Sequence, residues 1–162
     1  MAEARKKKRS SVERVVRLRA GRPAPMAGLM SVFGAPMPLP EHEQMAVRAA
    51  QEMVEMIVLF NLERDAAGKP PITIGIGIAS GEMVAGYTGT NERATYTCVG
   101  DTVNLAARLE THTKVVQRGI LIDRATRAAL SERIAVEPLR PVPFRGKAAA
   151  VEVFSVSPGQ KR

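Results

Sequence analysis

The sequence predicts an α+β domain with a largely antiparallel sheet. A long segment from Glu41 to about Ala67 has apolar residues at three- and four-residue spacing, which indicates one helix. Isoleucine alternates with Thr, Gly or Ala from Ile72 to Ala79, which is the two-residue period of a strand. Short apolar runs then alternate with short helical patterns towards the C-terminus. Elements mixed in this order favour one sheet with helices packed against it.

Composition is that of one globular domain. The chain has 162 residues, of which 45% are hydrophobic and 25% are charged. Cys98 is the only cysteine and cannot form a disulfide within the chain, which favours a cytoplasmic location. No apolar run approaches the roughly 20 residues of a membrane span. The basic N-terminus is not followed by the apolar stretch of a signal peptide.

The formal charge of +8 is concentrated at the N-terminus. Residues 1–25 contain nine Lys or Arg and two Glu, whereas residues 26–162 contain fifteen basic and fourteen acidic residues. The run Arg5–Arg9 repels itself, and the glycine and prolines near the end of this segment break regular structure. We expect residues 1–25 to be a disordered leader, with at most a short helix over 11–19.

A basic leader can attract nucleic acid or an anionic membrane surface. This one has no aromatic side chain on which a base would stack and no large apolar face that would enter a bilayer. A solvated segment is therefore the simpler interpretation. Nucleic acid is kept only as an alternative partner.

The first half of the body predicts a strand and the long helix. Leu29–Phe33 is expected to be a buried strand, followed by a stiff connector that contains three prolines. Acidic residues at Glu41 and Glu43 suit the positive N-terminus of the helix, and Gly68 followed by two prolines ends it. Its methionines are more simply explained by core packing than by a partner-binding surface.

The strand Ile72–Ala79 has one bulky face and one nearly bare face, so another element can approach its backbone closely. We expect Ser80–Glu82 to turn the chain and Met83–Tyr87 to return as the hairpin partner of this strand. Thr95–Val99 is predicted to be another short strand.

A second helix is predicted from Asp101 to roughly Thr111, with Asp101 or Thr102 as its cap. The remaining predicted elements are a strand over Gly119–Asp123, a helix over Arg124–Ile134, and two strands over 136–144 and 151–156.

Several candidate sites fail on their context. Gly75–Gly81 is glycine-rich, but its spacing differs from that of a dinucleotide-binding turn and the next element is not a helix. There is no phosphate-binding P-loop. His42 and His112 have no Cys or acidic companions at the spacing of a zinc site. Cys98 has no nearby His in sequence that would activate a nucleophile, so it reads as a small strand side chain.

Asn104 and Arg108 are the candidate pair that remains. Four residues on a helix place both side chains on one face, with Cβ atoms roughly 5–6 Å apart. The amide can bind a sugar hydroxyl, and the planar guanidinium can bind a phosphate. From chemistry alone, an ordinary pair on a helix surface explains them as well.

The segment Tyr96–Glu110, which reads YTCVGDTVNLAARLE, closely resembles the signature of the class III adenylate and guanylate cyclases. The resemblance runs from Ile72 to Phe154 and, less strongly, from Gly28 to Met53, and it covers the C-terminal two-thirds of a catalytic domain. The other matching motifs are Leu29–Pro36 before a helix that opens with His42, Gly75–Gly86, and Phe144–Lys147.

The resemblance implies a ferredoxin-like sandwich that pairs head to tail with a second cyclase domain, as a homodimer or a heterodimer. In that family two Mg²⁺ or Mn²⁺ ions, held by two aspartates, activate the ribose 3′-hydroxyl, which attacks the α-phosphate and releases pyrophosphate. Asn104 corresponds to the residue that orients the ribose, and Arg108 to the arginine that stabilises the transition state. Thr97 corresponds to the purine-selecting position, where threonine resembles bacterial adenylate cyclases and favours ATP.

The parts that hold the metals do not match. Nothing in residues 1–25 resembles the opening strand and helix of the family, and these residues contain no Asp. Ala27 occupies the position of the second metal aspartate, and Pro23 that of the purine-selecting lysine. An alanine methyl cannot bind Mg²⁺, which needs oxygen ligands. We expect a truncated cyclase domain over residues 26–158, followed by a short tail over 159–162.

Two functions remain open. By family the chain is an adenylate cyclase, a lyase that makes cyclic AMP for intracellular signalling, but we expect it to be inactive as a homodimer. It can still be the metal-free partner that supplies Asn104 and Arg108 to an intact cyclase domain. Alternatively, it is a non-catalytic relic that binds a nucleotide weakly or pairs with other cyclase domains.

Overall fold

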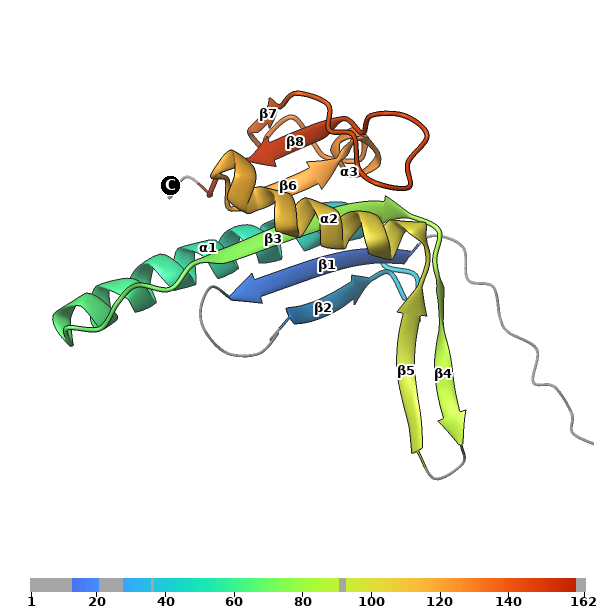
Figure 1. Cartoon of the computed structure of the whole chain (residues 1–162), viewed down its shortest axis with the longest axis horizontal. Helices are drawn as coiled ribbons and strands as arrows, with labels where there is room; N and C mark the ends of the chain where they lie inside the picture. The colour runs from blue at the N-terminus through green and yellow to red at the C-terminus, as the bar shows by residue number, and fades with distance from the viewer. Residues whose placement is uncertain (1–12, 21–27, 36, 91–92, 160–162) are drawn as a thin grey trace, which may run out of the picture.

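The computed structural model describes residues 13–20, 28–35, 37–90 and 93–159, and its body is one sheet with a long helix on each face (Figure 1). Within these residues six strands form the sheet in the order β2-β1-β3-β6-β8-β7, and two further strands form a separate hairpin, β4-β5. Neighbouring strands of the sheet are antiparallel except β3 and β6, which are parallel. The predicted α+β fold with a largely antiparallel sheet is confirmed.

The bounds of the elements follow the chain. They are β1 (Glu13–Ala20), β2 (Gly28–Phe33), α1 (His42–Ala66), β3 (Ile74–Gly81), β4 (Val84–Thr90), β5 (Arg93–Val99), α2 (Asp101–Val116), β6 (Ile120–Asp123), α3 (Arg124–Ala128), β7 (Val136–Pro138) and β8 (Val153–Val156). In the described part of the chain, no helix has both the length and the apolar character needed to cross a membrane.

Strand β1 is the largest departure from the sequence prediction, because it lies within the segment expected to be a disordered leader. Glu13–Ala20 pairs antiparallel with β3 over eight residue pairs and with β2 over six. The short helix expected over 11–19 is therefore wrong for residues 13–19. Without β1, one edge of β3 would leave its N–H and C=O groups unpaired, and this requirement outweighs a weak helical pattern. The predicted boundary at residues 25 and 26 lies outside the described residues.

Strand β2 is the edge of the sheet and is more exposed than predicted. Leu29 is 59% exposed and Met30 is 40% exposed, whereas Phe33 packs against the core. The expectation of a buried strand was based on its apolar sequence alone. An edge strand has a neighbour on one side only, so the same residues are left partly open.

Helix α1 covers one face of the sheet with small side chains rather than with its methionines. Ala46, Val47 and Ala50 are fully buried and pack in one cluster with Ile76 and Ile78 of β3. The distal half of the helix extends beyond the sheet (Figure 1). Of the methionines, Met53 packs against the core, but Met45 and Met56 are exposed, so the predicted methionine core is only partly correct.

Helix α2 lies on the opposite face, over the glycine positions of β3. A Cβ placed on Gly77 would collide with the backbone oxygen of Ala106 and the backbone nitrogen of Glu110. The predicted close approach to a bare strand face is confirmed. The helix continues five residues past the predicted end because Thr113 fills the space over Gly75, where its hydroxyl donates to the Glu110 carbonyl at 2.5 Å.

The hairpin β4-β5 differs from the prediction in its pairing. Val84–Thr90 pairs with Arg93–Val99, and not with β3 as expected. Both edges of β3 are already occupied, by β1 on one side and β6 on the other. The returning segment therefore finds its partner in the next strand, and the hairpin projects away from the sheet (Figure 1). Cys98 is buried at its base, as expected for a small strand side chain.

The C-terminal elements are shorter than predicted. Helix α3 ends at Ala128 instead of Ile134, and strand β7 covers only Val136–Pro138. Beyond it, a single bridge joins Val142 to Val151. Only Leu130 of the segment after α3 is buried, so packing does not extend the helix.

A buried polar cluster ties α3 to β3. The Asp123 carboxylate accepts from the Thr126 N–H at 2.9 Å and from the Ser80 N–H at 3.3 Å. The hydroxyls of Ser80 and Thr126 lie 2.5 Å apart. Asp123 is thus the N-cap of α3 and is itself only 6% exposed.

Stability should depend on pH through Asp123. Burial raises the pKa of this carboxyl above its ordinary value of 3.8, although hydrogen bonds from Thr126 and Ser80 partly oppose the shift. The folded state therefore keeps the proton to higher pH than the unfolded state. Its stabilising contribution is present at low pH and is lost as pH rises through the raised pKa.

The variant Asp123→Asn keeps an acceptor for the Thr126 N–H but cannot ionise. Urea unfolding between pH 3.5 and pH 7 is expected to show that its free energy of unfolding gains on that of the wild type as pH rises. Parallel curves for the two proteins would show that Asp123 does not titrate differently on folding.

Candidate active-site groove

Asn104 and Arg108 line one groove on the outer face of α2, as their four-residue spacing predicts. The groove has a volume of about 470 Å³, and its second wall comes from residues more than thirty positions later in the chain. Its lining residues are Asn104, Ala107, Arg108, Thr111, His112, Val115, Pro143, Phe144 and Arg145. The volume is within the range of small-molecule sites in proteins.

The Arg108 guanidinium has a donor without an acceptor. Its Nη1 atom is buried and has no hydrogen-bond partner among the described residues. Its Nη2 atom lies beside Gly146, at 3.6 Å from the position where a Cβ would be. A buried donor that makes no hydrogen bond is costly, and more so when it is charged. The groove is therefore suited to an anionic ligand that accepts from Arg108.

The turn at Phe144–Lys147 forms the second wall and is attached to α2. The Lys147 ammonium forms an ion pair with the Asp101 carboxylate, at the first turn of α2. The Phe144 ring meets the His112 ring edge to face, with centroids 5.7 Å apart. Gly146 has a φ of +81°, which a residue with a side chain rarely adopts.

The start of α2 is not capped as predicted. The N-cap residue is Gly100, and no side chain caps the first turn. Asp101 turns to Lys147, and the Thr102 hydroxyl donates to the Glu82 carbonyl at 2.9 Å. Both polar side chains therefore bind neighbouring segments instead of the backbone of their own helix.

Thr97 lies on β5, opposite Gly86 of β4, and is half-buried. It does not line the groove of Asn104 and Arg108. The other two positions singled out by the sequence, Pro23 and Ala27, lie outside the described residues. The structure thus brings together two of the predicted site residues and leaves Thr97 outside their groove.

The groove does not suit Mg²⁺ or Mn²⁺. Its lining contains no carboxylate and includes two guanidinium groups, from Arg108 and Arg145. Such cations prefer several hard oxygen ligands, and the arginines would repel them. Within the described residues there is also no group of three or more His, Cys, Asp or Glu side chains that would hold a metal ion.

Sequence reasoning missed His112 and Arg145 as groove residues. His112 was considered only as a zinc ligand, yet it lies four residues after Arg108 and eight after Asn104, on the same helix face. That spacing was available in the sequence. Arg145 belongs to a motif that the resemblance included, but its position against α2 depends on the packing of two distant segments.

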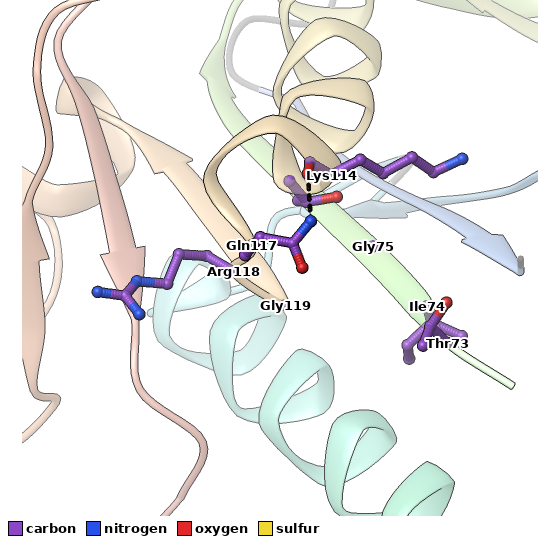
Figure 2. A pocket seen from close by; sticks show the side chains of 8 residues that line it. Thr73, Ile74, Gly75, Lys114, Gln117, Arg118 and Gly119 are labelled. Carbon is purple, nitrogen blue, oxygen red and sulfur yellow. Dashed lines mark hydrogen bonds between the residues drawn. The ribbon is translucent and has the colours of Figure 1, made fainter. Parts of the chain in front are cut away.

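A second cavity, of about 300 Å³, lies between the end of α2 and the start of β3 (Figure 2). Its basic residues, Lys114 and Arg118, point away from each other (Figure 2). Arg118 forms an ion pair with Glu137 at 2.9 Å, and Gln117 donates to the Lys114 carbonyl at 2.8 Å. The polar groups do not converge on a common point, so we do not assign this cavity a ligand.

Comparison with known proteins gives a consistent picture. The family model described as "Adenylate and Guanylate cyclase catalytic domain" matches residues 28–157. Adenylate cyclase 1 of Rhizobium meliloti (strain 1021) is 31% identical over 128 residues, which cover 79% of this chain and 19% of that protein. The chain thus spans about a fifth of the length of this curated relative.

Solved structures share the fold. The adenylyl cyclase CyaB from P. aeruginosa superposes with a TM-score of 0.80 at 19% identity, over 93% of this chain and 96% of that one. The guanylyl cyclase Cya2 superposes with a TM-score of 0.78 at 25% identity, over 93% of each chain. The similarity therefore extends over nearly the whole chain and nearly the whole of each solved domain.

Proposed function

The chain belongs to the family of adenylate and guanylate cyclase catalytic domains, and we propose that it retains the nucleotide-binding half of a cyclase active site without the metal-binding half. Asn104 orients the ribose, and Arg108 binds the phosphate on which charge develops. The proposal joins the identity of these two residues, four apart on one helix, to their position in one groove.

The observation that carries the proposal is the unpaired donor of Arg108. A guanidinium whose Nη1 is buried without an acceptor gains most from a ligand that brings its own negative charge. A nucleotide phosphate is such a ligand, and the groove is large enough for the sugar and phosphate part of one. Arg145, at the rim, adds to the positive potential.

ATP is the proposed nucleotide. Thr97 stands at the purine-selecting position of the family, and threonine there resembles bacterial adenylate cyclases. Because Thr97 lies outside the groove of Asn104 and Arg108, we assign the base a separate subsite near β5. Loss of the lysine at Pro23 removes one contact to that base, so we expect binding to be weak.

The proposed consequence for catalysis is that the chain alone forms no cyclic AMP. The reaction needs metal ions to activate the ribose hydroxyl and to neutralise the phosphates. Ala27 has no oxygen with which to bind them, and the groove contains no carboxylate. Asn104 and Arg108 can orient a nucleotide, but they cannot replace this contribution.

Turnover by the purified chain tests this point. With ATP and either Mg²⁺ or Mn²⁺, we expect cyclic AMP formation to stay at the level of the protein-free blank. An intact adenylate cyclase domain under the same conditions is the positive control. Robust turnover that disappears in Arg108→Ala would overturn the proposed inactivity, since it would show a complete site in this chain.

A heterodimer is the second proposed role, and the exposed groove on α2 favours it. In the family each active site takes its metals from one domain and its Asn and Arg from the other. An intact cyclase domain whose own transition-state arginine is replaced by alanine keeps its metal site and lacks this half. Mixing it with the present chain should restore cyclic AMP formation, and mixing it with Arg108→Ala should not. Equal activity in both mixtures would favour a non-catalytic relic.

A further inference from the structure

The turn at residues 144–147 is attached to α2 at two points, one on each side of Arg108. At the N-terminal end of the helix, Asp101 forms the ion pair with Lys147, whose side chain is 22% exposed. Two turns beyond Arg108's position the His112 ring contacts Phe144. Within the turn, the Lys147 N–H donates to the Phe144 carbonyl at 3.1 Å.

The position of this turn determines the space around the Arg108 guanidinium. Gly146 lies directly beside Nη2, and Phe144 and Arg145 form the wall that faces Asn104. A shift of the turn away from α2 would widen the groove and let the guanidinium leave its present orientation. A shift of about 1 Å is enough to weaken a site that depends on aligned donors.

We propose that Asp101 is a positioning residue, which holds the 144–147 turn through Lys147 and thereby aligns Arg108 towards the phosphate of a bound nucleotide. This inference rests on the proposed function, because it assigns Asp101 a role in the same site. Asp101 lies in the first turn of α2 and does not line the groove. Its carboxylate is 68% exposed, and exposed ion pairs add little to stability.

The variant Asp101→Asn separates these two effects. It keeps the size of the side chain and removes the charge that holds Lys147. Its affinity for a non-hydrolysable ATP analogue, measured by calorimetry, is expected to fall by about tenfold, whereas its melting temperature without ligand stays close to that of the wild type. The matched control is Glu152→Gln, which breaks an ion pair with Arg124 of similar exposure and distant from the groove. The control should bind the analogue as the wild type does.

Hydrogen exchange provides a readout that needs no nucleotide. In the ligand-free protein, the amide of Lys147 is protected by its bond to the Phe144 carbonyl. We expect it to exchange faster in Asp101→Asn and at the wild-type rate in Glu152→Gln. Equal exchange in all three proteins would overturn the proposal, because the ion pair would then not hold the turn.

The exchanged pair Asp101→Lys with Lys147→Asp tests whether the link itself matters. If the link positions the turn, the double variant recovers most of the affinity and the slow exchange. Tighter nucleotide binding in Asp101→Asn, or a double variant that stays as weak as the single one, would overturn the positioning role. If the wild type binds no nucleotide while exchange still quickens in Asp101→Asn, the proposed function fails, and with it the role in alignment, but the attachment of the turn stands.

Discussion

Arg108→Ala is expected to lose most of the stabilisation that a nucleotide gives to this chain, without loss of stability in the absence of ligand. An arginine–phosphate contact contributes about 1.5–3 kcal/mol, so Kd should rise by roughly 10- to 150-fold. With ligand at about 100 times the wild-type Kd, the wild type gains about 2.7 kcal/mol. A variant that binds about 30-fold more weakly gains only about 0.9 kcal/mol.

The two proteins should therefore separate clearly in a thermal melt with an ATP analogue. For a domain of this size, each kcal/mol moves the midpoint by about 2–4 °C, so the wild-type shift should be several degrees. Without ligand, Arg108→Ala should melt at or above the wild-type temperature, because it removes a buried donor that has no acceptor.

Arg124→Ala is the matched control for the loss of one arginine. Arg124 is 77% exposed and pairs with Glu152, and it does not line the groove. Its ligand-induced shift should equal that of the wild type. An equal shift in Arg108→Ala would contradict the proposed phosphate contact. No shift in any of the three proteins would contradict nucleotide binding itself.

The elements with a strong local pattern were predicted well. Helix α1 begins and ends within one residue of its predicted bounds, because acids at the start and a Gly-Lys-Pro-Pro sequence at the end fix its termini. The glycines of β3 predicted the close approach of another element for the same local reason: a strand without side chains on one face leaves room there.

The errors concern pairing, which no local pattern determines. Residues 13–20 contain a valine pair among arginines, and they become a strand because β3 offers an unpaired edge. Strand β4 does not return along β3, because β1 and β6 occupy both edges. The long helix over-runs the sheet, and this fact of tertiary size leaves Met56 exposed.

The candidate site was predictable to the extent that it lies on one helix. Asn104 and Arg108 share a face by spacing alone, and the sequence signature around them predicted their chemistry. The opposite wall at Phe144–Lys147 could not be placed, because it depends on how β8 returns beside β6 and delivers the preceding loop to α2. The unpaired Nη1 of Arg108 is a property of that packing.

Gly77→Ala should cause the largest loss of stability among the substitutions considered. The added methyl would meet the backbone oxygen of Ala106 and the backbone nitrogen of Glu110, and neither can move without displacing α2 from β3. Overpacking of this kind costs about 3 kcal/mol, or about 6–12 °C in melting temperature for a domain of this size. Urea unfolding and thermal melts measure both quantities.

Gly86→Ala is the control that separates a collision from a general effect of replacing glycine in a strand. No atom lies within 4 Å of the position where its Cβ would be. We expect a change of less than about 0.5 kcal/mol, because the methyl enters open space. Since α2 carries both Asn104 and Arg108, Gly77→Ala should also weaken nucleotide binding in the fraction that remains folded. A loss in Gly77→Ala as small as that in Gly86→Ala would mean that α2 does not rest on the bare face of β3, and the groove built on that helix would lose its support.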